Sequence, residues 1–380
     1  MKKDLKGKKL LILGGTKLSC EIIKAAQKLG VYVIVTDYLE DSPGKKIADE
    51  SYMISTTDVQ SVVALIKDKQ IDGILTGFID SMLPYYSEIC KRAGIPCYGT
   101  NKQFEITTNK VKFKNACRTY GIPVVEEYNI KFPFNKNELE NIEYPVLIKP
   151  VDNSGARGIL ICNNANELIE KYPISLSFSR TKHVLIERYM TSKEATIFYL
   201  IQNGDIILSS MADRHVNNKQ GGIIPLPVAY TFPSKHLIKY QENLNFKVIE
   251  MFKSLGFKNG MIFIQTFIEN GECIFYEMGY RLTGSLEYKI IEKMNGLNPL
   301  KLMINYALTG EMHNLSIKEV INPNYSKFGF NITFLAKPGK IGKIVGVEEV
   351  KALDNIIDVV KAYDEGGVVP NDALGTLQQV

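Results

Sequence analysis

The chain has no tryptophan, only four histidines in 380 residues, and no apolar run near the roughly 18 residues that a membrane span requires. The histidines (His183, His215, His236, His313) are too dispersed for zinc-ligand spacing, so any bound metal is expected to have oxygen ligands. The six cysteines form no CxxC pair, which indicates buried thiols in a reducing, cytoplasmic setting. We therefore expect no membrane partner.

Most of the chain also lacks a large excess of either positive or negative charge. The net charge is +5, but five lysines and one aspartate fall within the first nine residues, so the remaining body is close to neutral. A nucleic-acid-binding protein needs a basic face, and none is expected here. With 45% hydrophobic and 23% charged residues, the composition is that of a globular protein with two or three domains.

Residues 1–100 alternate short apolar runs with helical patterns, which predicts a parallel α/β sheet. The first residues are basic and are followed by the apolar run Leu10 to Leu13, a pattern similar to a signal peptide. The run is too short and ends at Gly14-Gly15, so it is expected to form a first strand. The expected strands are 9–13, 31–36, 53–54, 73–76 and 96–98, and the expected helices are 18–29, 59–69 and 82–93.

Residues 101–310 are expected to form a second domain, helical over 101–120 and richer in strands beyond Gly121 and Pro123, with a subdomain at about 121–190. Its expected strands are 145–149, 158–162, 183–187, 194–201, 206–211, 261–268 and 273–281, and its expected helices are 238–255, 286–294 and 300–308. A linker at 311–324 leads to a small β-rich region. Gly375 to Val380 resembles the start of a strand, so a truncated end is one expectation.

The loop Gly14-Gly15-Thr16 follows the first strand and opens a helix. It lacks the full GxGxxG pattern of a dinucleotide site, because Glu21 stands where the third glycine belongs. A tight turn in the sheet and a contact with substrate or phosphate at a helix N-terminus are both open interpretations.

A second loop, from Lys149 to Gly158, is more specific. Lys149 ends an apolar strand, and because an unpaired buried ammonium is costly, it should meet an anion. Ser154, Gly155 and Gly158 could wrap backbone N–H groups around phosphate oxygens, although no Walker A sequence follows. The alternative is an exposed hairpin turn with an ion-paired lysine.

The third feature is a hairpin that turns at Glu269 to Glu272. Period-2 alternation places Glu277, Gly279 and Arg281 on one face, and Gln265 interrupts an apolar row on the partner strand. A carboxylate, an amide and a guanidinium on one face suit Mg²⁺ and a polyphosphate. An Arg–Glu ion pair covering the sheet is the alternative.

Taken in order over roughly residues 9–310, these features resemble the ATP-grasp superfamily with its preceding Rossmann-like domain. The loop Gly14-Gly15-Thr16, together with Asp37 and residues 41–49, is similar to the start of carboxyaminoimidazole ribonucleotide synthases. Gln265, Glu277 and Arg281 resemble one ATP-grasp half of the carbamoyl-phosphate synthase large chain. The implied fold is α/β and α+β: a Rossmann-like domain, an ATP-grasp fold of two α+β subdomains and a small β-rich C-terminal region.

The resemblance implies a role for each matching residue. The ATP phosphates would contact Lys110, Lys149 and the loop with Ser154, Gly155 and Gly158. The adenine and ribose would contact Glu187, the backbone of Arg188 and Met190, and Glu194. Mg²⁺ would be held by Glu277 and Gln265, and Arg281 would stabilise an acyl phosphate. Gly279 departs from the family, which usually has Asn or Asp there, so the number of Mg²⁺ ions is open.

The resemblance also implies roles for further residues, because Asp213 to His215 stand where such enzymes place phosphate and substrate contacts. Arg214 is a candidate γ-phosphate ligand and His215 a candidate proton carrier. Substrate specificity is expected from Asp37, Phe78 and Asp80, and from Thr283-Gly284-Ser285 after Arg281. Asp80 and Ser285 could equally cap helices.

The resemblance implies an ATP- and Mg²⁺-dependent carboxylate–amine ligase that works through an acyl phosphate and releases ADP and phosphate. Two alternatives stay open: a bicarbonate-dependent carboxylating enzyme, and a nucleotide-binding regulator with a degraded metal site. The partners are then a small carboxylate and an amine, and the resemblance also implies a cytoplasmic homodimer.

Overall fold

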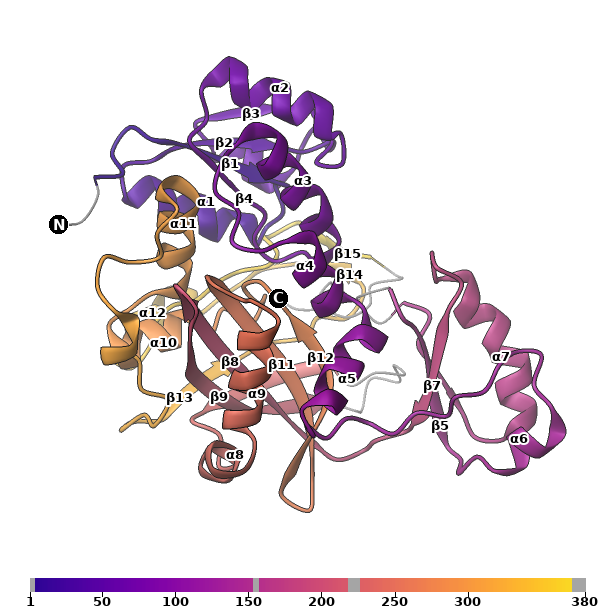
Figure 1. The fold of residues 1–380 in the computed structure, drawn as a ribbon. Coiled ribbons are helices and arrows are strands. Elements are labelled where there is room, and N and C mark those ends of the chain that lie inside the picture. Colours follow the sequence, from indigo (N-terminus) through magenta and orange to yellow (C-terminus); the bar gives the residue numbers. More distant parts are fainter. Residues whose placement is uncertain (1–3, 153–156, 218–225, 371–380) are drawn as a thin grey trace.

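The structure is a computed structural model that describes residues 4–152, 157–217 and 226–370. A first unit lies at the top of Figure 1, a large sheet below it, and a small lid to the right. None of the helices in the described ranges has the length and apolarity that crossing a bilayer requires.

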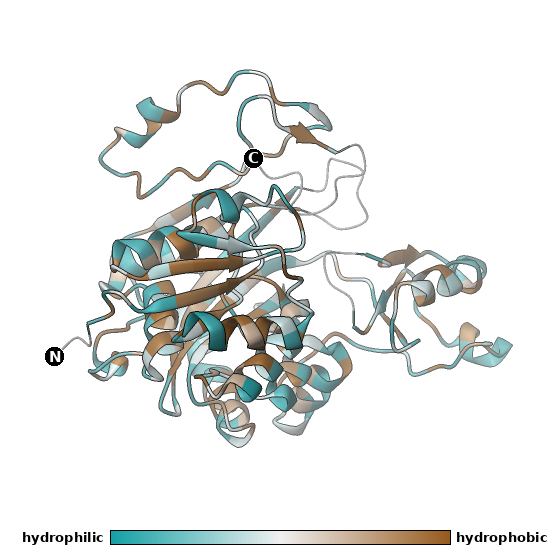
Figure 2. Cartoon of the chain, turned by 90° about the horizontal axis from the view of Figure 1, so that it is seen from above, coloured by the Kyte–Doolittle hydropathy of each residue, from teal (hydrophilic) through white to brown (hydrophobic). Residues whose placement is uncertain are grey.

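The first unit is a parallel four-stranded sheet of order β3-β2-β1-β4. Its elements are β1 (Lys9–Leu13), α1 (Ser19–Lys28), β2 (Tyr32–Thr36), β3 (Glu50–Tyr52), α2 (Val59–Lys69), β4 (Gly73–Leu75) and α3 (Leu83–Ala93). The third strand ends before the expected 53–54, and 96–98 forms no strand. The apolar strands are brown in Figure 2, as burial between helices requires.

One helix from far along the chain completes this unit. Helix α11 (Pro299–Thr309) packs against α1 and β4. The approach is so close that a Cβ on Gly73 would lie 1.9 Å from the carbonyl oxygen of Ala307. The first unit and the large sheet therefore share one continuous core.

The large sheet has six strands in the order β12-β11-β8-β9-β10-β13. They are β8 (Lys193–Gln202), β9 (Asp205–Asn217), β10 (Leu226–Phe232), β11 (Gly260–Glu269), β12 (Glu272–Gly279) and β13 (Gly329–Ile332). All pairings are antiparallel. The hairpin of β11 and β12 forms where alternation predicted it, with a bulge between Gln265 and Thr266.

Helices expected as single units are divided. Residues 101–120 form α4 (Asn101–Thr108) and α5 (Lys110–Thr119), and 238–255 forms α8 (Leu237–Asn243) and α9 (Asn245–Ser254). Asn109 separates the first two because its side chain accepts hydrogen bonds from the N–H groups of Val111 and Lys112, both at 3.1 Å, and so caps a new helix. Helix α10 (Tyr288–Asn295) follows the hairpin.

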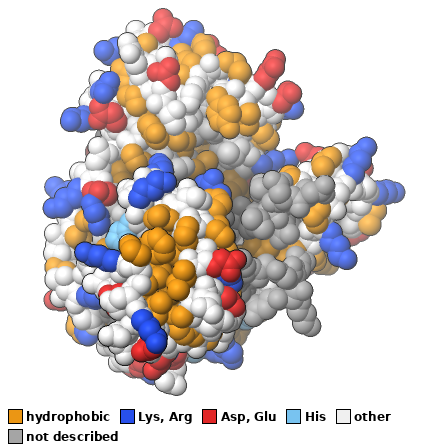
Figure 3. Space-filling view, turned by 90° about the vertical axis from the view of Figure 1, so that its right-hand side faces the viewer, with side chains coloured by type: hydrophobic (Ala, Val, Ile, Leu, Met, Phe, Trp, Pro, Cys, Tyr) orange, Lys and Arg blue, Asp and Glu red, His pale blue; other side chains and the backbone are white. Residues whose placement is uncertain are grey.

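The lid is a three-stranded antiparallel sheet of order β6-β5-β7 with its own small core. It contains α6 (Lys136–Glu140), β5 (Val146–Pro150), β6 (Leu160–Cys162), α7 (Ala165–Ser177) and β7 (Val184–Arg188). Helix α7 was not expected, because Pro173 inside it interrupts the helical pattern. Hydrophobic side chains gather on the face in Figure 3, and the lid exposes Phe132, Ile169, Ile174 and Phe178.

The C-terminal region has less strand than the sequence indicated. After β13 its described residues form only β14 (Gly339–Lys340), α12 (Val347–Lys351) and β15 (Val368–Val369). In Figure 2 this segment runs apart from the body, at the top of the view. Lys17 Nζ binds Asp364 Oδ2 at 2.9 Å and Lys289 pairs with Asp358, which ties the segment to the first unit and to α10. Residues 375–380, where a truncated end was expected, lie outside the described residues.

Candidate active site

A cavity of about 1690 Å³ opens between the large sheet, the lid and residues 344–363. Most of the residues expected to bind nucleotide, metal or acyl phosphate line it: Lys110, Lys149, Glu187, Arg188, Met190, Glu194, Arg214, Gln265, Glu277 and Arg281. Thr283, Gly284 and Ser285 line it as well. These side chains come from helix α5, the lid and four strands of the large sheet, so only the folded chain brings them together.

A buried cluster of charges joins the lid to helix α5. Lys149 Nζ lies 2.6 Å from Glu187 Oε2, and the second oxygen of Glu187 pairs with Lys114. Lys114 is fully buried and also donates to the carbonyl of Val125 at 2.9 Å. The anion expected for Lys149 is thus a carboxylate of the chain itself. Lys114 was missed from the sequence, although its place four residues after Lys110 puts both on one helix face.

The pKa values of this cluster follow from its burial. Burial alone would raise the pKa of Glu187, but the charges of Lys149 and Lys114 outweigh it, so the carboxyl titrates below its usual range. Burial lowers the pKa of Lys114, and Glu187 partly offsets that change. Burial lowers the pKa of Lys110 too, with Glu277 opposing it. The charge of Glu277 thus acts on the pKa of Lys110, and this interaction links the lysine cluster electrostatically to the hairpin.

The hairpin carries the candidate metal ligands. Gln265 and Glu277 are direct cross-strand partners of β11 and β12, and both line the cavity. In the described ranges the side chain of Glu277 has no hydrogen bond or ion pair, and no three His, Cys, Asp or Glu side chains gather as a metal site. One carboxylate opposite one amide fits Mg²⁺, which usually takes one or two carboxylates and completes its octahedron with phosphate and water.

The glycine that departs from the family is explained by its neighbour across the strands. Gly279 lies opposite Phe263, and a Cβ added to Gly279 would lie 2.2 Å from a ring carbon of Phe263. The aromatic ring fills the space that an Asn or Asp side chain would need. A third protein ligand is therefore sterically excluded at this position while Phe263 keeps its place.

We expect Gly279→Asn to destabilise the chain by about 1–3 kcal/mol, the usual cost of overpacking a filled site, and to give no gain in ATP hydrolysis. Urea denaturation measures the stability, and Gly279→Asn combined with Phe263→Ala is the matched control. Because the smaller side chain removes the clash, the double variant should be more stable than the sum of the two single losses. Additive losses would contradict this steric explanation.

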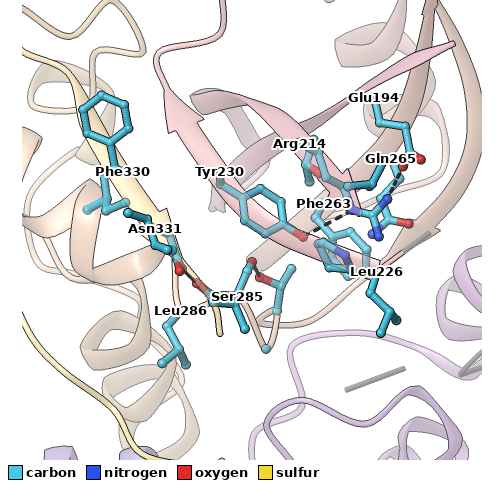
Figure 4. A pocket seen from close by; sticks show the side chains of 18 of the residues that line it. Glu194, Arg214, Leu226, Tyr230, Phe263, Gln265, Ser285, Leu286, Phe330 and Asn331 are labelled. Carbon is cyan, nitrogen blue, oxygen red and sulfur yellow. Dashed lines mark hydrogen bonds and ion pairs between the residues drawn. The ribbon is translucent and has the colours of Figure 1, made fainter. Parts of the chain in front are cut away.

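Two predicted site residues pair with each other. Glu194 and Arg214 face one another on β8 and β9 and form an ion pair, and Tyr276 Oη donates to Glu194 Oε2 at 2.8 Å. Arg214 Nε also donates to Tyr230 Oη at 3.4 Å (Figure 4). Burial alone would lower the pKa of Arg214, but Tyr276 and Glu194 raise it, so the guanidinium stays charged. Contact of Glu194 with ribose and of Arg214 with γ-phosphate stay predictions.

The connection between lid and sheet restricts how the backbone could contact adenine. Arg188 N–H donates to the carbonyl of Glu126 at 3.1 Å, so this N–H is already used, while Arg188 and Met190 both line the cavity. Contact of their backbone with adenine stays a prediction. The side chain of Arg188 binds Glu269 through two hydrogen bonds of 3.1 and 2.8 Å. This ion pair links the end of β7 to the hairpin.

Several expected residues lie away from the cavity. His215 lines a smaller pocket beside it and sits 2.9 Å from Thr231 Oγ1, so its role as proton carrier in the main cavity is not supported. Asp37, Phe78 and Asp80 are not among the residues that line the cavity, so their part in substrate specificity stays a prediction. Gly158 packs against Phe178 and Pro150 at a turn instead. Ser154 and Gly155 lie outside the described residues.

The first glycine loop is a turn closed by its own chain. The Asp37 carboxylate accepts hydrogen bonds from Gly15 N–H at 2.7 Å and from Leu39 N–H at 2.9 Å. A Cβ on Gly15 would lie 2.4 Å from Ser42 Oγ. The Gly15 N–H group that could have met a phosphate is thus already used, which favours the structural interpretation of this loop.

Comparison with known proteins agrees with the geometry. Residues 109–315 match the family described as the carbamoyl-phosphate synthase L chain, ATP binding domain. The 2-oxoglutarate carboxylase small subunit of Hydrogenobacter thermophilus is 25% identical over 349 residues, covering 84% of this chain and 70% of that protein.

Two solved structures have similar folds. The biotin carboxylase domain dimer of Hydrogenobacter thermophilus 2-oxoglutarate carboxylase, in complex with MgADP, ADP and bicarbonate, has a TM-score of 0.73 at 22% identity, over 88% of this chain and 78% of that one. The L-amino acid ligase of Bacillus licheniformis has a TM-score of 0.76 at 19% identity, over 97% and 91%. The expected fold class and the ATP-grasp resemblance are confirmed.

Proposed function

The chain belongs to the family of the carbamoyl-phosphate synthase L chain ATP-binding domain, and from this we propose that it is an ATP- and Mg²⁺-dependent carboxylate–amine ligase. The observation that carries the proposal is the convergence of Lys110, Lys149 and Arg281 with the facing pair Gln265 and Glu277 on one cavity. This arrangement supplies positive charge and a metal position where a carboxylate must approach a polyanionic nucleotide.

The proposed reaction has two steps. A carboxylate oxygen attacks the γ-phosphorus of ATP, an O–P bond forms, the bond to the bridging oxygen breaks, and ADP leaves. The amine then attacks the acyl carbon, phosphate leaves, and the amine loses a proton. Each step needs a dry, positively charged site more than it needs a general base.

The residues divide this work by position. Lys110 and Lys149 would bind phosphate oxygens from the helix and lid sides, and Arg281 would meet the acyl phosphate. Glu277 and Gln265 would hold the metal ion, which when bound neutralises charge on the phosphates. Met190 and Glu194 line the part of the cavity next to the lid connection, where the adenosine is proposed to lie.

A second candidate is favoured by the relatives. A 2-oxoglutarate carboxylase subunit matches the chain over most of its length, so bicarbonate could be the carboxylate that is activated. This reaction would use the same residues and differ only in the acid bound near Arg281. A requirement for bicarbonate separates the two candidates. Homodimerisation and a cytoplasmic location stay predictions.

The test is ADP and phosphate release with a panel of amino acids and small carboxylates, with and without bicarbonate. We expect turnover with one pair, and Lys110→Ala should lower kcat by about 10²–10³-fold, the usual cost of removing one charge-stabilising donor. Lys112→Ala is the matched control, because Lys112 is on the same helix but exposed and paired with Glu105. AMP and pyrophosphate as products would contradict the proposal. Tight ATP binding without turnover would favour a regulator.

A further inference from the structure

The guanidinium of Arg281 is held by a carboxylate from the first unit. Arg281 Nε lies 2.8 Å from Asp80 Oδ1 and Nη2 lies 2.5 Å from Asp80 Oδ2, while Nη1 donates to the carbonyl of Leu282 at 2.8 Å. The side chains are 14% and 18% exposed, so the ion pair is largely shielded from water. A two-point Arg–carboxylate contact fixes the plane of the guanidinium as well as its position.

An aromatic ring supports the same guanidinium from below. The guanidinium carbon lies 5.0 Å from the centroid of the Phe263 ring, within the range of a cation–π contact. Phe263 can occupy this place because Gly279 opposite it has no side chain. Gly279, which offers no side-chain ligand to a metal, thus leaves space for the Phe263 ring that contacts Arg281.

Two buried tyrosines join the first unit to the end of the hairpin beside this pair. Tyr98 Oη donates to the carbonyl of Tyr280 at 3.1 Å, and Tyr280 Oη donates to the carbonyl of Tyr98 at 2.6 Å. Their rings meet edge to face at 5.0 Å between centroids, and both are buried. Tyr280 directly precedes Arg281, so this contact between the two units lies next to the Asp80–Arg281 pair.

Arg281 lines the cavity, but Asp80 does not. We propose that Asp80 is a positioning residue: together with Phe263 it orients Arg281 so that its remaining N–H groups face the acyl phosphate. Of the five N–H donors of an arginine, Asp80 and Leu282 use three, which leaves two for phosphate oxygens. Asp80 offsets part of the charge of Arg281, so the direction of these donors matters in addition to the charge. This inference rests on the proposed function.

The test compares Asp80→Asn, Arg281→Lys and the double variant in the full-length chain, with the acid and amine that support turnover. We expect Asp80→Asn to lower kcat by about 10–100-fold, because a misplacement of about 1 Å can cost that much, while KM for ATP stays within about twofold. MgADP affinity, measured by calorimetry, should also stay within that range. The double variant should be no slower than the slower single variant, because both substitutions remove one interaction.

Two further variants control for charge and folding. Glu88→Gln removes a carboxylate paired with Arg92 (Nε–Oε1 2.6 Å) on an exposed face of the same unit, and it should leave kcat unchanged. Asp80→Glu should recover part of the rate lost in Asp80→Ala, and thermal unfolding identifies any variant that does not fold.

The outcomes separate the inference from the function on which it rests. A full rate in Asp80→Asn, or multiplied losses in the double variant, would overturn the positioning role while Arg281→Lys still shows that the arginine matters. Full activity in Arg281→Lys would contradict its role in the proposed mechanism. If the chain binds MgADP but no pair of acid and amine makes it form ADP from ATP, both the proposed function and this inference are overturned.

Discussion

Replacing Glu277 by glutamine is expected to lower Mg²⁺-dependent turnover by about 10³-fold. The amide keeps the shape of the side chain but removes the negative charge from the only carboxylate of the proposed metal position, and several kcal/mol of charge stabilisation depend on the metal. The stability of the fold should change little, because the side chain of Glu277 is half-buried and has no hydrogen bond or ion pair in the described ranges. Initial rates over a series of Mg²⁺ concentrations measure the effect.

A matched control lies on the same strand. Glu272→Gln removes a carboxylate that is 43% exposed and pairs with Lys239 at 2.7 Å, at the far end of the hairpin. Its rate and its Mg²⁺ dependence should stay within about twofold, since exposed pairs contribute little. An equal kcat and an equal Mg²⁺ requirement in Glu277→Gln and the unsubstituted chain would show that the metal is held elsewhere.

The second large effect is on stability. Glu187→Gln is expected to destabilise the chain by about 3–5 kcal/mol at neutral pH, because it leaves Lys149 buried without its anion and removes one of the two carboxylates paired with Lys114, the other being Glu127 at 3.1 Å. Urea denaturation measures the loss. Glu269→Gln is the control, because that carboxylate is 34% exposed and its pair with Arg188 should contribute only about 0–1 kcal/mol. Equal losses in the two variants would contradict the importance of the buried cluster.

The same carboxyl predicts a pH dependence. Its pKa is lower in the folded chain than the value of about 4.3 expected when unfolded. Its contribution to stability is therefore fully present above that pH and is lost as the pH falls through the folded pKa. The difference in unfolding free energy between the chain and Glu187→Gln should shrink below about pH 4. A difference that is constant from pH 7 to pH 3 would contradict this.

Local sequence patterns predicted individual strands and the side chains that share one face of a strand. The apolar run from Lys9 to Leu13 formed β1, and period-2 alternation placed Gln265 and Glu277 on one face even though a bulge follows Gln265. The apolar strand before Lys149 predicted a buried ammonium in need of an anion. These features depend on residues near one another in the chain, so periodicity and burial cost are sufficient to find them.

Contacts between distant segments could not be predicted in this way. Asp80 and Arg281 are 201 residues apart, and the chain gives no signal that they meet. The partner of Lys149 is Glu187 on β7, a neighbouring strand of the lid sheet, 38 residues further along the chain. The role of Phe263 depends on the missing side chain of Gly279 on another strand. Tertiary packing decides each of these contacts, and a single sequence does not record it.

The proposed mechanism requires that a carboxylate be activated as an acyl phosphate. The most direct measurement uses the acid that supports turnover, labelled with ¹⁸O in its carboxyl group, and follows the label by ³¹P NMR of the released phosphate. We expect one ¹⁸O atom in phosphate for each ADP formed, and we expect Lys149→Ala and Glu277→Gln to lose label and ADP together. Phosphate without label, formed at the full rate of ADP release, would contradict it.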